Sequence, residues 1–165
     1  MGVGFVVAAA LARGVTAAEA GAFLLVYLVA QSAAGLAWGV LADRFGWKLV
    51  LQSGAACLAT GMLLAMGAVE VTGFAAAFAL LGMANAANMS SDPNLTFELA
   101  PPDDTARYLG VTMTVIAPAL AIGPLVAGVI AGFASYAALF ALSALLAIAG
   151  LVTATLRFRE PRART

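Results

Sequence analysis

The sequence contains no histidine, only one cysteine and few charged residues. Charged residues make up 10% of its 165 residues, and the net charge is zero. The single cysteine, Cys57, cannot form an intramolecular disulfide, and without histidine there is no Cys/His cluster to bind zinc, haem or an iron–sulfur centre. A neutral chain also lacks the basic surface that binds nucleic acid. We therefore expect no metal, no cofactor, no nucleic-acid partner and no enzymatic activity, with Cys57 a small apolar side chain.

Apolar residues dominate the chain instead. They make up 64% of it, and the mean hydropathy is +1.03. A soluble domain carries about 25% charged residues, so a soluble fold would have too little polar surface to cover itself. An α-helix needs roughly 20 apolar residues to cross ~30 Å of hydrocarbon. This criterion predicts an all-α, polytopic membrane helix bundle embedded in a lipid bilayer. The apolar runs between the groups of charged residues give the spans, which are residues 20–42, 49–69, 71–91, 108–131 and 136–156, followed by a tail over 157–165.

The first twelve residues form a shorter apolar segment. A helix over residues 1–12 reaches only about 18 Å, too little to cross a bilayer. We interpret it as the last part of a helix whose beginning is missing from this chain. Thr16 and Glu19 form a capping box that opens the next helix, and Gly132 with Ser135 marks the break between the last two spans.

The basic residues predict how the bundle is oriented. Alternation of the spans places seven of the eight on one side: Arg44, Lys48, Arg107, Arg157, Arg159, Arg162 and Arg164. Only Arg13 lies on the opposite side. The positive-inside rule makes the first side cytoplasmic, which predicts a cytoplasmic C-terminus in the cell (inner or plasma) membrane.

A short charged turn between two long apolar runs carries the most specific motif. Its sequence, Gly39-Val-Leu-Ala-Asp43-Arg44-Phe-Gly46-Trp-Lys48, resembles the loop motif G-x-L-a-D-r-x-G-r-k of the major facilitator superfamily, a class of twelve-helix secondary transporters. The resemblance extends over nearly the whole chain. It implies one six-helix repeat with its first helix truncated.

Four features of the sequence bear on which repeat this is. Trp47 replaces the usual first basic residue of the motif, a departure that suits the second repeat. The loop around 98–110 and the ending 157–162 are similar to the close of such chains. We therefore assign the chain to the C-terminal half, with part of helix 7 and helices 8 to 12, so that the N-terminal half of the same transporter is missing. Gly123 and Pro124 favour the opposite assignment, because they resemble part of an antiporter motif of the first repeat.

The motif residues have both a physical and an implied role. Gly35 and Gly39 leave a smooth strip on which another helix can pack closely, and Gly46 permits a tight turn. Asp43 is placed to cap the helix that begins near Lys48. The resemblance further implies that Asp43 and Arg44 latch the cytoplasmic side in one conformation. The candidate gating motif is therefore Gly39, Asp43, Arg44, Gly46 and Lys48. The alternative is that Asp43 is only a cap and that Arg44 and Lys48 only fix the topology.

Polar residues within the spans are candidates for the substrate path. Such side chains are costly in a membrane unless they face the bundle interior or water. Asn85 and Asn88 share one face of the span 71–91, which the resemblance assigns as a cavity-lining helix. Tyr27 and Gln31 form a second stripe on the span 20–42. Hydrogen bonding between helices is the alternative role for these amides.

Glycine and proline are frequent in the span 108–131. Pro118 and Pro124 remove backbone donors and can kink the helix, while Gly123 and Gly128 permit close packing. These residues are candidates for a hinge during alternating access. The alternative is that they reflect only the general abundance of Gly and Pro in membrane helices.

The resemblance implies secondary active transport of a small solute by alternating access, as part of a twelve-helix carrier. The absence of a sugar-porter ending favours efflux, while the sequence does not specify the substrate or the coupling ion. Two alternatives stay open: a half-size carrier that dimerises, and a membrane scaffold that transports nothing.

Overall fold

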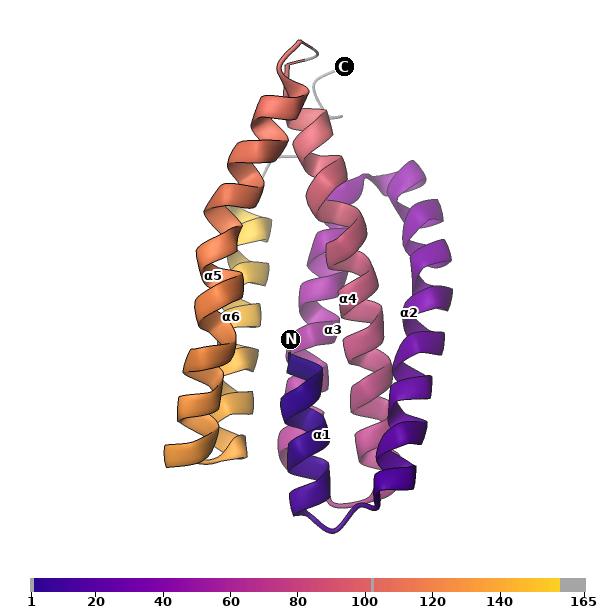
Figure 1. The fold of residues 1–165 in the computed structure, drawn as a ribbon. Helices are drawn as coiled ribbons and strands as arrows, with labels where there is room; N and C mark the ends of the chain where they lie inside the picture. Colours follow the sequence, from indigo (N-terminus) through magenta and orange to yellow (C-terminus); the bar gives the residue numbers. More distant parts are fainter. Residues whose placement is uncertain (1, 102, 158–165) are drawn as a thin grey trace.

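The computed structural model describes residues 2–101 and 103–157, which form six α-helices and no strand (Figure 1). The helices are α1 (Gly2–Ala12), α2 (Ala17–Phe45), α3 (Trp47–Gly67), α4 (Val71–Leu99), α5 (Thr105–Phe133) and α6 (Tyr136–Leu156). All but α1 are long and apolar enough to cross a membrane. The expected all-α membrane bundle is therefore confirmed.

Capping residues and a turn glycine mark the start of α2, the start of α6 and the turn between α2 and α3, as the sequence predicted. The Thr16 hydroxyl accepts a hydrogen bond from the Glu19 amide (3.3 Å), and the Glu19 carboxylate accepts one from the Thr16 amide (2.8 Å), which completes the capping box of α2. The Ser135 hydroxyl caps α6 by accepting from the Ala138 amide (3.1 Å). Gly46 adopts a φ of 87° between α2 and α3, a conformation that glycine adopts without strain.

Helix α4 is at the centre of the packing. It lies against α2 on one side and α3 on the other, and α3 also packs along α6. Helix α5 contacts α4 and α6 much more sparsely, and none of its residues is buried. In Figure 1, α4 and α5 meet at the top and diverge toward the bottom, where α1 lies between α5 and α4 in this view.

The largest buried side chains form an aromatic cluster at the end of the bundle where α1 lies. The Phe23 ring of α2 lies 6.1 Å from the Phe74 ring and 5.4 Å from the Phe78 ring of α4, measured between centroids. Phe140 of α6 and Val6 of α1 belong to the same core. Aromatic contacts of this kind add to the stabilisation from apolar burial.

Glycine permits the closest helix approaches. A Cβ atom at Gly82 of α4 would overlap the Tyr27 carbonyl oxygen of α2, and one at Gly54 of α3 would overlap the Ala87 side chain of α4. Only a residue without a side chain fits at either crossing, so both helices pack closely on α4.

Helix α4 extends further than the sequence suggested. The charged stretch after Ser91 was expected to be a connection, whereas the helix continues through Asp92 and Pro93 to Leu99. Proline removes only one backbone donor, and nearby side chains supply others: Asn94 donates to the Ser90 carbonyl (2.7 Å) and Thr96 to the Asp92 carbonyl (2.8 Å). The charges therefore mark where a membrane span would end and not where the helix ends.

The connections alternate between the two ends of the bundle. The turn at Gly46, the α4–α5 connection and the end of α6 lie at the same end (Figure 1). Arg44, Lys48, Arg107 and Arg157 therefore gather there, as expected. The other three basic residues of that group, Arg159, Arg162 and Arg164, lie outside the described residues.

Candidate functional site

A partly open cavity of about 590 Å³ lies between the helices and is lined by residues of all six. Val3 and Phe5 of α1 lie at its wall, as do Tyr27 of α2 and Met62 of α3. The remaining wall is formed by α4, α5 and α6. A volume of this size is typical of sites for small organic molecules.

The polar groups of the cavity are few and uncharged. They are Tyr27, Asn85 and Asn88 together with Ser143 of α6, and no charged side chain of the described residues lines the wall. The Ser143 hydroxyl already donates to the Leu139 carbonyl (2.9 Å). The phenol and the two amides therefore remain as the groups that can hydrogen bond to a molecule in the cavity.

Helix α5 contributes the glycine and proline expected to act as a hinge. Gly123 and Pro124 line the cavity, whereas Pro118 and Gly128 do not. Both prolines lie inside the helix, which remains continuous from Thr105 to Phe133. The cavity wall on this side is therefore a helix turn from which Pro124 removes a backbone hydrogen bond.

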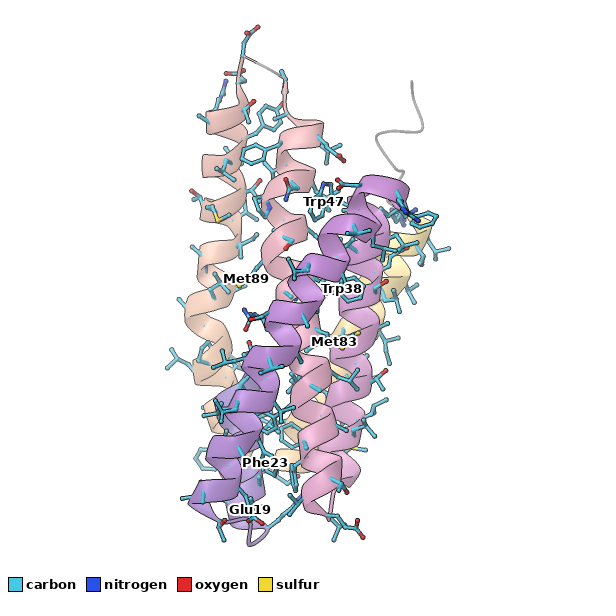
Figure 2. All side chains as sticks on the ribbon, turned by 90° about the vertical axis from the view of Figure 1, so that its right-hand side faces the viewer. Glu19, Phe23, Trp38, Trp47, Met83 and Met89 are labelled. Carbon is cyan, nitrogen blue, oxygen red and sulfur yellow. The ribbon has the colours of Figure 1, made fainter. Side chains whose placement is uncertain are left out.

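Gln31 lies outside the cavity, in contact with a residue that the sequence did not single out. Its amide nitrogen lies 3.6 Å from the Met89 sulfur, and the Asn85 amide nitrogen lies 3.4 Å from the same atom. Asn85 therefore belongs both to the cavity and to a second polar cluster of Gln31, Asn85 and Met89. Figure 2 shows Met89 beside α2, on the side of the bundle where α5 lies.

The motif turn lies at one end of the bundle, away from the cavity. Asp43 and Arg44 are exposed in the last turn of α2, and Gly46 is buried between α2 and α3. The N-cap residue of α3 is Gly46, which has no side chain to cap the helix, and the capping role of Asp43 stays a prediction. Helix α2 continues through Asp43 to Phe45, so this carboxylate lies in the last turn of α2.

The glycine strip of α2 faces open space. A Cβ atom at Gly35 or Gly39 would meet no described atom within 4 Å, and the same holds for Gly123 and Gly128 of α5. The close helix contact expected at these glycines is therefore not made inside this bundle.

Sequence reasoning missed three residues that organise the structure. Arg13 donates to the carbonyls of Ala65, Met66 and Ala68 at the end of α3. Gly82 sets the α2–α4 distance, and the Trp38 indole donates to the Met83 carbonyl (2.9 Å) across the same helix pair (Figure 2). An arginine in a helix connection and a glycine flanked by apolar residues carry no signal of their own, because each depends on a partner distant in sequence.

The comparisons with known proteins agree with this architecture. The family model described as Major Facilitator Superfamily matches residues 1–165, the whole chain. No curated protein matches the chain. The family is one of membrane transporters and not of enzymes, and five helices of the described residues are apolar and long enough to span a bilayer. This chain therefore belongs to the major facilitator superfamily, as an integral multi-pass membrane protein of the transmembrane-transport class.

Proposed function

We propose that the chain is one half-bundle of a secondary carrier that moves a small solute by alternating access. The cavity is the observation that supports this proposal. It lies between the helices, and its mostly apolar wall includes the polar side chains of Tyr27, Asn85 and Asn88. Gly123 and Pro124 also line it. Tyr27, Asn85 and Asn88 would contact the solute, and the proline turn of α5 would allow the wall to bend.

A second bundle completes the carrier in this proposal. Helix α5 has no buried residue, and the glycines of α2 and α5 face open space. Shallow glycine surfaces are typical of helix–helix interfaces in membranes. We assign the chain to the C-terminal half, with α1 as the end of helix 7, so that the second bundle is the N-terminal half of the same transporter.

The motif turn would act as the gate of the cytoplasmic side. Asp43 and Arg44 are exposed at the end where four basic residues of the described chain gather. This distribution supports a cytoplasmic location for the turn and the C-terminus in the cell membrane. At that position the two side chains can pair with the second bundle in one conformation and separate in the other. The direction of transport in this proposal is export.

The experiment begins with the gene. The DNA upstream of the Met1 codon is sequenced, and the chain is expressed with and without any in-frame extension. Everted membrane vesicles are then tested with ethidium, Nile red and fluorescein as cationic, neutral and anionic probes. Carrier-dependent accumulation of a probe that requires the extension supports the proposal. Transport by the chain alone would favour the dimerising half-size carrier, and no transport of any probe would favour the scaffold.

Variants of the cavity test the site itself. Asn85→Ala and Asn88→Ala should raise the KM for the transported probe, because each removes a hydrogen-bonding group from the wall. Asn94→Ala is the matched control: Asn94 lies on the same helix but bonds to the Ser90 carbonyl outside the cavity. Equal kinetics for all three variants would contradict the assignment of the path.

A further inference from the structure

Two amide groups from neighbouring helices converge on one sulfur atom. The Gln31 and Asn85 nitrogens lie 3.6 Å and 3.4 Å from the Met89 sulfur. A thioether sulfur is a weak acceptor, so these bonds use little of the hydrogen-bonding capacity of either amide. Oxygen acceptors bind amide donors better than sulfur does, and a ligand oxygen at this point would replace the sulfur.

The backbone holds the two amides together. Gly82 brings α4 so near to α2 that a Cβ atom there would overlap the Tyr27 carbonyl oxygen and lie 3.1 Å from the backbone nitrogen of Gln31. The Trp38 indole bonds to the Met83 carbonyl across the same pair of helices. The close packing of α2 and α4 therefore fixes the backbone positions from which the Gln31 and Asn85 side chains extend, independently of their contact with Met89.

Met89 can leave this position at small cost. Its side chain is 66% exposed, and methionine is unbranched and adopts many rotamers. Pro93, four residues later, has no N–H to bond to the Met89 carbonyl, so this turn of α4 lacks one of its helix bonds. Burial therefore does not hold the Met89 side chain in place, and the backbone of this helix turn has one hydrogen bond fewer to constrain it.

Resting on the proposed transport function, we propose that Gln31 and Asn85 form a hydrogen-bond-donating subsite for an oxygen of an uncharged amphipathic substrate. Met89 occupies the subsite until substrate displaces it. A carbonyl, ether or hydroxyl oxygen fits the two donors. The apolar body of the molecule lies in the adjoining cavity, which Asn85 also lines.

The composition of the cavity wall is the reason for proposing an uncharged substrate. No charged side chain of the described residues lines it, and burying a charge without a partner is costly. Substrates with a neutral oxygen acceptor are therefore preferred over cations of the same shape.

The first test observes Met89 directly in the full carrier. Methionine is labelled with ¹³C at its methyl group in lipid nanodiscs, and the Met89 signal is assigned with the variant Met89→Leu. Nile red presents a neutral ring system with a carbonyl oxygen, and Nile blue is a cationic relative with a nitrogen at that position. Nile red should shift the Met89 signal saturably, whereas Nile blue should not. Met66, outside the cavity wall, is the internal control.

The second test uses variants with opposite expected effects. Met89→Leu removes the competing sulfur and should tighten Nile red binding about three- to tenfold, while Gln31→Leu and Asn85→Leu should weaken it by a similar factor. Loss of packing alone would not tighten binding. Weaker binding by Met89→Leu, or a wild-type Met89 signal that ignores Nile red or responds equally to Nile blue, would overturn the proposal. A saturable Met89 shift without transport would support the subsite and contradict the transport function.

Discussion

Arg13 ties two connections of the bundle together, and its removal should destabilise the fold. Its guanidinium donates to the carbonyls of Ala65 (3.0 Å), Met66 (3.2 Å) and Ala68 (2.7 Å), and it lies 5.7 Å from the centre of the Phe74 ring. The last carbonyls of a helix have no partner within the helix. Arg13 therefore acts as a C-cap for α3 that is supplied by the α1–α2 connection.

The size of the effect follows from these contacts. A hydrogen bond from a charged donor contributes about 1.5–3 kcal/mol, and an exposed cation–π contact about 0.5–1 kcal/mol. The three bonds share one guanidinium; two are partly buried and the one to Met66 is exposed, so their contributions do not add fully. Arg13→Ala should lower the free energy of unfolding by about 2–3 kcal/mol. For a domain of this size, that loss corresponds to roughly 5–10 °C in Tm.

The assay is thermal unfolding of the purified carrier in detergent. The measured quantity is the fraction of protein that stays monodisperse after heating to each temperature. Arg13→Lys should recover less than half of the loss, because an ammonium group cannot reproduce the planar fork of donors. Arg107→Ala, which removes an exposed arginine at the other end of the bundle, serves as control. A Tm of Arg13→Ala equal to that of this control would refute the capping role.

Three further predictions concern the α2–α4 pair and the motif turn. Gly82→Ala should destabilise the carrier by about 1–3 kcal/mol through overpacking. Gly150→Ala on α6, where a Cβ meets no described atom within 4 Å, should not lower the Tm; equal Tm values for the two variants would contradict the close contact at Gly82. Trp38→Phe should cost about 1 kcal/mol through loss of the bond to the Met83 carbonyl, which urea titration of the purified carrier can measure. Asp43→Asn should reduce vesicle transport while immunoblots show an unchanged amount in the membrane; unchanged transport would argue against a gate at this turn.

Much of the fold could be predicted because its signals are local. The capping box of Thr16 and Glu19 and the cap at Ser135 depend on residues three apart in sequence. The length of each apolar run decides whether it can form a helix that crosses the bilayer. The spacing of Asn85 and Asn88 likewise placed both on one helix face. The structure brings them together with Tyr27 at one cavity, and their part in transport stays a prediction.

The remainder depends on how two helices are rotated against each other, which periodicity does not specify. Gln31 shares a helix stripe with Tyr27, yet it contacts Met89 and not the cavity. Gly82 is one of many glycines in the sequence, and only the position of α2 makes it indispensable. The end of α4 was missed for another reason: charged residues and Pro93 indicate the membrane boundary, but a helix in water can continue past both.

The length of α4 and α5 has a mechanical consequence. Each contains 29 residues, about 43 Å of helix, which exceeds the ~30 Å hydrocarbon layer. Their shared hairpin rises beyond the α2–α3 turn in Figure 1. It acts as a lever arm, since any tilt of the bundle displaces its tip more than a point near the midplane. A fluorophore attached at Asp103 would therefore convert small movements around the cavity into a large optical signal on the accessible side of the membrane.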